Sequence, residues 1–171
     1  VADSLSAIKF ANVKPVLNEE GFVVNFETTG TFPKYGNDDD RVDLIAKDMT
    51  HKVITELRKT PTYRGAEHTL SVLTITSNVM YGKNTGATPD GRRKGEEFSK
   101  NLSPTMGVDT EGVTALVQTL ASLDSFDFPG DFPLDIMLIP YTVSGEKGLD
   151  MMKALIYQYF DNGGFVVQFN V

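Results

Sequence analysis

The strongest local constraint in this sequence is an amphipathic segment that follows the polar residues 37–40. Apolar residues recur there every three or four positions, at Val42, Ile45, Ala46, Met49, Val53, Ile54 and Leu57. Because this period matches the turn of an α-helix, these residues fall on one side, which must pack against another element. An acidic residue of the polar run is a suitable N-cap, and the pattern stops near Thr60 and Pro61. The spacing predicts a helix with one buried face.

The remaining patterns alternate between helix and strand. Helical spacing occurs over residues 4–11, 113–123 and 145–162, the last followed by Gly163 as a left-handed C-cap. Runs that favour strands cover residues 21–27, 71–78, 134–140 and 165–171. Pro15 breaks the first helical pattern, and residues 81–95 are expected to form a loop. This alternation predicts an α/β fold in which helices cover a sheet.

Composition narrows the class of protein. The 171 residues, 40% of them hydrophobic, are enough for one domain with its own core. The absence of cysteine excludes disulfides, thiolate zinc sites and a cysteine nucleophile from these residues. A net charge of -7 argues against a nucleic-acid surface or an anionic membrane. With no long apolar run and no basic leader followed by an apolar one, the sequence predicts a cytoplasmic protein.

The most distinctive stretch is residues 71–93, SVLTITSNVMYGKNTGATPDGRR, where a strand pattern runs into a glycine-rich loop. Pro89 presets a turn, Asp90 can bond nearby amides and Gly91 tolerates positive φ. Arg92 is placed to anchor the loop to a carboxylate or a carbonyl. The composition of this stretch predicts a structured turn.

Residues 71–93 resemble the corresponding segment of the pyruvate formate-lyases, and the core TGATPDGR is similar to one shared across glycyl radical enzymes. The opening ADSLSAIKFANVKP, the later YGNDDDRVD and the Thr62-Tyr63-Arg64 triplet resemble the same family in the same order. The likeness is close over residues 1–107, weaker over 108–162, and loose over 165–171. It identifies the chain as a member of the pyruvate formate-lyase type of glycyl radical enzyme.

The resemblance implies that residues 1–171 are one segment of the family's α/β barrel domain, truncated at both ends. It implies a parent formate C-acetyltransferase, an acyltransferase of anaerobic metabolism that converts pyruvate and coenzyme A to acetyl-coenzyme A and formate. It also implies a protein glycyl radical, coenzyme A as co-substrate, a homodimer and a radical-SAM activating enzyme. The partner of this segment would be the remainder of the parent enzyme.

The residues that carry out the family's radical chemistry are missing from this sequence. The family uses a pair of adjacent cysteines, and no cysteine occurs here. It stores the radical in an Arg-Val-x-Gly-Tyr segment, whose nearest counterpart is Val143-Ser144-Gly145, flanked by Thr142 and Glu146. We interpret that counterpart as a turn before a helix. No catalytic, cofactor-binding or metal-binding residue is therefore predicted, and the chain alone is expected to be inactive.

Other candidate sites have plainer interpretations. The run GATPDGRR resembles a phosphate loop, but it lacks the Lys-Ser/Thr pair and Pro89 removes an amide. Residues 37–40 depart from the EF-hand pattern of calcium sites, so we expect them to cap a helix. His51 and His68 form no metal pair and are expected to be structural. We expect the basic residues Arg92, Arg93 and Lys94 to lie in a solvated loop. The remaining candidates are expected to be packing residues: Met151, Met152, Phe126, Phe128 and Phe132.

Two alternatives to the formate acetyltransferase remain open. One is a fragment of a 2-ketobutyrate formate-lyase or of another glycyl radical lyase, such as one acting on a diol or choline. The other is an independently folding accessory or assembly module without catalysis. A module should cover its apolar faces, whereas a segment of a larger enzyme should expose apolar surface and unpaired sheet edges.

Overall fold

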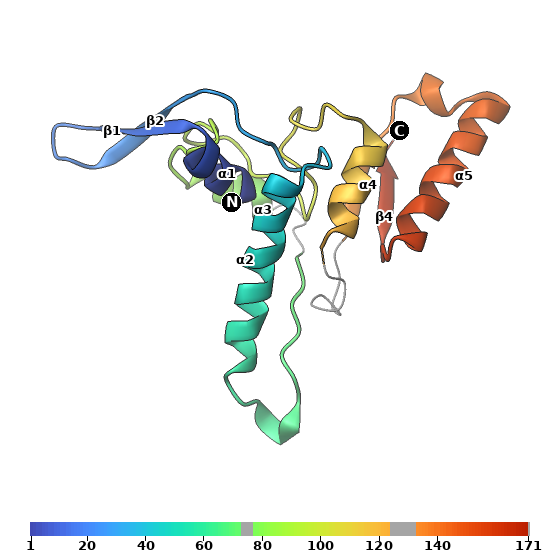
Figure 1. Cartoon of the computed structure of the whole chain (residues 1–171), viewed down its shortest axis with the longest axis horizontal. Coiled ribbons are helices and arrows are strands. Elements are labelled where there is room, and N and C mark those ends of the chain that lie inside the picture. The colour runs from blue at the N-terminus through green and yellow to red at the C-terminus, as the bar shows by residue number, and fades with distance from the viewer. Residues whose placement is uncertain (73–76, 124–132, 171) are drawn as a thin grey trace.

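The computed structural model describes residues 1–72, 77–123 and 133–170 of the chain (Figure 1). Its helices and strands follow in this order: α1 (Ala2–Phe10), β1 (Asn12–Leu17), β2 (Val23–Thr29), α2 (Asp40–Arg58), η1 (Tyr63–Gly65), α3 (Ser77–Lys83), α4 (Val113–Ala121), β3 (Leu134–Met137), η3 (Pro140–Val143), α5 (Gly145–Asp161) and β4 (Val167–Asn170). The β1–β2 hairpin, α2 and α5 extend in three directions from a central region that contains α1, α3 and α4.

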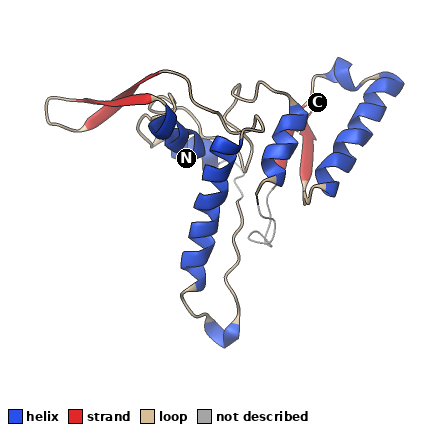
Figure 2. Cartoon of the chain, viewed as in Figure 1, coloured by secondary structure: helices blue, strands red, loops and turns tan. Residues whose placement is uncertain are grey.

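The described residues form two small sheets, and Figure 2 shows the β1–β2 hairpin well apart from the second one. β1 and β2 pair antiparallel, with Asn12 opposite Thr29 and a register shift between Val16 and Leu17. β3 and β4 pair parallel, with Leu134 opposite Val167. The helix α5 connects this parallel pair, which is the βαβ arrangement that parallel strands require. The α/β prediction is confirmed locally, but no closed barrel forms within the described residues.

Helix α2 begins where the polar run predicted. Asp39 is the N-cap, and its carboxylate accepts a hydrogen bond from the Arg41 N–H at 3.0 Å. The buried residues of the predicted face are Val42, Ala46 and Ile54. The second half of that face is only partly covered, because Val53 and Leu57 are exposed while Ile54 is buried. Periodicity therefore placed the helix correctly but overstated how much of it this chain covers.

The other predicted helices are confirmed, including Gly163 after α5 with a φ of +87°. The predicted strand over 71–78 is wrong at its end, because Ser77 and Asn78 start helix α3. Residues 73–76 of that prediction lie outside the described parts. The sequence also missed β1, which accommodates Pro15. The predicted strand over 134–140 ends earlier, since Pro140 begins the short helix η3, a position that suits its fixed φ.

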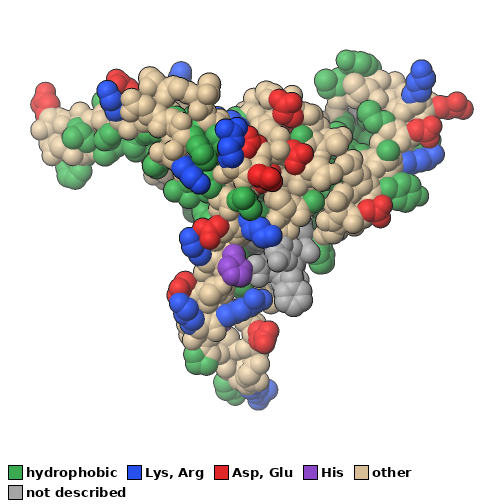
Figure 3. All heavy atoms as spheres, in the orientation of Figure 1, with side chains coloured by type: hydrophobic (Ala, Val, Ile, Leu, Met, Phe, Trp, Pro, Cys, Tyr) green, Lys and Arg blue, Asp and Glu red, His purple; other side chains and the backbone are tan. Residues whose placement is uncertain are grey.

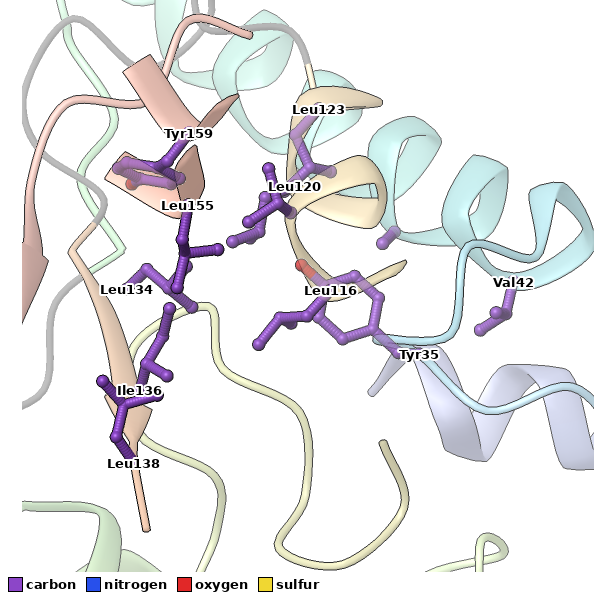
Figure 4. Packing of buried hydrophobic residues seen from close by; sticks show 12 residues of the cluster. Tyr35, Val42, Leu116, Leu120, Leu123, Leu134, Ile136, Leu138, Leu155 and Tyr159 are labelled. Carbon is purple, nitrogen blue, oxygen red and sulfur yellow. The ribbon is translucent and has the colours of Figure 1, made fainter. Parts of the chain in front are cut away.

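A single hydrophobic core joins the central helices to the parallel strands (Figure 4). Leu116 and Leu120 of α4 face Leu155 of α5 and Leu134 of β3. Tyr159 closes one end of this core, and its hydroxyl donates a hydrogen bond to the Val166 carbonyl at 2.9 Å. Of the predicted packing residues, Met152 lies against the core and Met151 is exposed. The three phenylalanines of that prediction, Phe126, Phe128 and Phe132, lie outside the described residues.

The molecule exposes more surface than its mass requires. Its accessible surface is 10953 Å², whereas a compact monomer of 18.8 kDa exposes about 8,300 Å². Figure 3 shows hydrophobic side chains on the outside of the hairpin and near α5. No helix in the described parts is long and apolar enough to cross a bilayer. The large open surface bears on the choice between a module and a segment of a larger protein.

Candidate functional site: the anchored loop and the joint

The Pro-Asp-Gly segment folds as an anchored loop, residues 85–98, which follows α3. Its turn closes through two backbone hydrogen bonds, from the Gly91 N–H to the Thr88 carbonyl at 3.1 Å and from the Thr88 N–H to the Arg92 carbonyl at 2.9 Å. Gly91 has a φ of +100°, which a residue with a Cβ adopts only under strain. The sequence therefore predicted both the turn and the reason for its glycine.

Arg92 is the centre of the anchored loop, with only 7% of its surface exposed. Its guanidinium donates hydrogen bonds to the carbonyls of Glu96 at 2.6 Å and Arg93 at 3.1 Å, and to the carbonyl of Gly86. It also lies 4.3 Å from the ring centroid of Phe98. Carbonyl dipoles and the ring face replace water around the charge.

These contacts decide between two predictions for Arg92. Anchoring to carbonyls is confirmed. The prediction of a solvated loop is wrong for Arg92, because its two terminal nitrogens donate to carbonyls inside the fold, although it is correct for the exposed Arg93 and Lys94. A guanidinium committed to its own loop is not presented to a phosphate, which agrees with the structural interpretation of this turn.

Three earlier segments hold the turn in place. The Ser4 hydroxyl of α1 donates to the Asp90 carboxylate at 2.6 Å. The Thr28 hydroxyl of β2 donates to the Pro89 carbonyl at 2.6 Å, and the Lys34 ammonium donates to the Asp90 carbonyl at 3.0 Å. Burial would raise the pKa of Asp90, but several hydrogen bonds, the largest from Ser4, together with the Lys34 charge outweigh it and hold the pKa below its ordinary value. Asp90 is thus a charged structural anchor.

Helix α3 packs directly on the returning side of the loop. The Asn78 amide donates to the Phe98 carbonyl at 3.1 Å, and the Phe98 N–H donates to the Asn78 carbonyl at 3.3 Å. Gly82 allows this approach, because a Cβ there would overlap the carbonyl of Glu96. The anchored loop is therefore fixed on one side by segments far from it in sequence and on the other by the helix that directly precedes it.

A second polar cluster, the joint, connects residues 35–43 to residues 108–119. The Asn37 side chain donates to the Val108 carbonyl at 2.8 Å and accepts from the Thr110 N–H at 2.7 Å. The Asp38 N–H donates to the Thr119 hydroxyl at 2.9 Å. The polar run predicted as a helix cap therefore caps α2 and also binds the segment before α4.

Asp43 is the buried carboxylate of the joint, with 2% of its surface exposed. Burial and the neighbouring Asp38 and Asp39 raise the pKa of Asp43 to about 6, against a lowering by the hydrogen bond from Thr119. Sequence reasoning missed this residue. The available signal was its place directly after Val42, at the edge of the buried face of the helix.

The other predicted sites are separate from these clusters. His51 is exposed on α2, and His68 is partly buried in the segment after η1. Val143-Ser144-Gly145 forms the turn from η3 into α5, as predicted, and Gly145 has a φ of +70°. Within the described ranges no group of three His, Asp or Glu side chains is placed to hold a metal ion.

Comparison with known families divides the chain at the anchored loop. The family model described as "Pyruvate formate lyase-like" matches residues 1–82, and the one described as "Glycine radical" matches residues 98–171. The anchored loop fills most of the interval between them, and the joint connects one region to the other. The chain belongs to the glycyl radical enzyme family.

Individual relatives agree with this assignment. The chain is 50% identical over 121 residues to the PFL-like enzyme TdcE of Escherichia coli K12, a match that covers 71% of this chain and 16% of that protein. Among solved structures, it is similar to hydroxyproline dehydratase from Clostridioides difficile, with a TM-score of 0.77 and 38% identity over 82% of this chain and 18% of that one.

The glycerol dehydratase of Clostridium butyricum, which is B12-independent, gives a TM-score of 0.74 and 36% identity over the same shares of the two chains. The chain thus spans about a sixth of the length of the relatives it matches. These likenesses establish the family and its local fold.

Proposed function

We propose that this chain is a structural, non-catalytic portion of a formate C-acetyltransferase, in which it connects the lyase-like region to the glycine radical region. The observation that carries the proposal is the 50% identity to a PFL-like enzyme, against 34–38% to other glycyl radical enzymes of solved structure, including two dehydratases. The parent reaction would convert pyruvate and coenzyme A to acetyl-coenzyme A and formate.

The role of the segment would be to hold the lyase-like region and the glycine radical region in a fixed arrangement. The joint connects the two regions by hydrogen bonds that involve buried or half-buried side chains, such as the Asn37 amide, which donates to the Val108 carbonyl, and the Thr119 hydroxyl, which accepts from the Asp38 N–H. Radical transfer between groups of an enzyme depends on their spacing, and small displacements of reacting groups cost orders of magnitude in rate. A rigid connection between the regions would maintain that spacing.

The residues present do not fit the radical chemistry itself. The chain has no cysteine, and Gly145 lies in the turn that starts α5, between Ser144 and Glu146. The glycyl radical, the coenzyme A site, the homodimer contacts and the surface for an activating enzyme would belong to other parts of the parent. We therefore expect no formate from the 171-residue chain under anaerobic activation, and measured turnover would contradict this.

A second candidate is another glycyl radical lyase, because the dehydratase structures reproduce the fold with TM-scores up to 0.77. The accessory module is less well supported, since the open surface and the unpaired edges of the β1–β2 hairpin are those of a segment that other protein covers. To separate the lyases, the activated full-length parent would be given pyruvate, 2-ketobutyrate, glycerol and hydroxyproline in turn. Formate from pyruvate supports the proposal, and dehydration of a polyol or of hydroxyproline would replace it.

A further inference from the structure

The β1–β2 hairpin, residues 12–29, has one face that is mainly apolar. Residues directly opposite in an antiparallel pair share a face, and so do alternate residues along a strand. The pairs Val13–Thr28 and Pro15–Phe26 therefore share one face, which we call the arm face. Leu17 continues this face by alternation along β1, and Val23 lies opposite Leu17 beyond the register shift after Val16. The opposite face carries the pairs Lys14–Glu27 and Val16–Asn25.

The arm face is covered only at its base. Thr28 contacts the anchored loop through the Pro89 carbonyl, and Val13 and Phe26 are half-buried. Farther out, Leu17 and Val23 are 54% and 51% exposed, and Phe22 at the hairpin end is 66% exposed. In Figures 1 and 3 this outer part projects from the body, with hydrophobic side chains on its surface. The exposed outer part therefore continues the same face that packs on the anchored loop at the base of the hairpin.

The β1 edge of the hairpin offers a poorer contact than the arm face. An added strand needs a row of free N–H and C=O groups, and Pro15 in β1 has no N–H to give. A two-stranded ribbon by itself is marginally stable in water, so an uncovered arm of this length needs a packing partner. The exposed apolar residues therefore favour contact through the arm face over strand addition at β1.

The amount of exposed surface indicates what kind of partner covers the arm face. The chain exposes 10953 Å², roughly 2,600 Å² more than a compact protein of its mass, whereas one side of a standard protein interface buries only about 800 Å². A symmetric dimer covers a single self-complementary patch. Exposed large apolar residues also occur on α1, α2 and α5, among them Ile8, Leu44 and Tyr157. A partner that covers apolar residues on elements pointing in three directions must be large.

We propose that the arm face docks on an apolar surface of the remainder of the parent polypeptide. This rests on the proposed function, since the relatives extend far beyond the matched segment. The hairpin would then act as a clamp that ties the anchored loop, through Thr28 and Pro89, to a part of the enzyme outside this sequence.

The test is hydrogen exchange of residues 12–29 in the full-length parent enzyme. We expect the hairpin amides there to exchange at least about tenfold more slowly than in the 171-residue chain. In the full-length enzyme, Leu17→Lys on the arm face should abolish most of that protection. The matched control Asn25→Lys, on the opposite face, should leave exchange within about twofold of the unaltered enzyme.

Rapid exchange of the hairpin in the unaltered full-length enzyme, or equal effects of the two lysine variants, would overturn the docking. Protection that disappears on dilution would overturn it as well, because the arm face would then bind a second copy. Formate production measured on the same samples reports the proposed function separately, so a protected hairpin in an enzyme that makes no formate leaves this inference standing.

Discussion

Asp43 of α2 and Thr119 of α4 are hydrogen-bonded inside the joint, where both side chains are almost fully buried. The same Thr119 hydroxyl accepts from the Asp38 N–H at 2.9 Å. One hydroxyl thus serves two groups of the lyase-like region from a helix of the glycine radical region. This places a titratable group where the two regions meet.

The stability of the chain should depend on pH through Asp43. Burial raises its pKa from 3.8 to about 6, so its contribution to the free energy of unfolding is complete below about pH 4 and is lost as the pH rises through 6. The loss is at most about 3 kcal/mol for a shift of this size. Thermal unfolding followed by circular dichroism at pH 5 and pH 7.5 measures the upper part of this loss.

The variant Asp43→Asn should flatten this dependence, since a neutral amide has no charge to desolvate. We expect the variant to gain stability over the unaltered chain at pH 7.5 and to gain less at pH 5. Asp48→Asn, on an exposed carboxylate paired with Lys52, is the matched control and should show no such change. An unchanged pH slope in Asp43→Asn would rule out Asp43 as the source.

Thr119→Val keeps the side-chain volume and removes the hydroxyl. The Asp38 N–H loses its acceptor and the Asp43 carboxylate loses its donor, so we expect a loss of about 1–3 kcal/mol in the free energy of unfolding. Urea denaturation is the measurement. The exposed Thr114 on the same helix provides the control, and Thr114→Val should change stability by less than about 0.5 kcal/mol.

Arg92→Lys tests the anchored loop. A lysine carries the charge but has neither the fork of donors nor the flat surface that meets Phe98, so at least one buried carbonyl loses its partner. We expect a loss of about 2–4 kcal/mol. The adjacent Arg93→Lys substitution, at an exposed position, should be nearly neutral. Equal denaturation midpoints for the two variants would show that Arg92 does not hold the loop.

Gly82→Ala reverses the usual expectation for a helix. Alanine normally stabilises a helical position over glycine by about 1 kcal/mol. Here its Cβ would overlap the Glu96 carbonyl, so we expect a loss of at least about 2 kcal/mol. Gly86→Ala is the control, because a Cβ at that position meets nothing within 4 Å. Comparison of the two melting temperatures decides whether α3 must approach the loop so closely.

Local patterns predicted the parts of the fold that depend on near neighbours. The period of Val42, Ala46 and Ile54 fixed α2, and the same reasoning fixed α4 and α5. The turn at Pro89 and Gly91 followed from backbone chemistry. These predictions succeeded because helix period, capping and turn geometry are set within a few residues of sequence.

The sequence by itself determined helices α1, α2, α4 and α5, the turn and the family, since each follows from residue order and spacing. Only the tertiary structure decided that Arg92 is buried, that Asn78 belongs to a helix, and that Asp43 meets Thr119. The physical reason is that burial and pKa depend on which distant segments enclose a side chain. Thr119 lies far from Asp43 along the chain, and no local pattern specifies that contact.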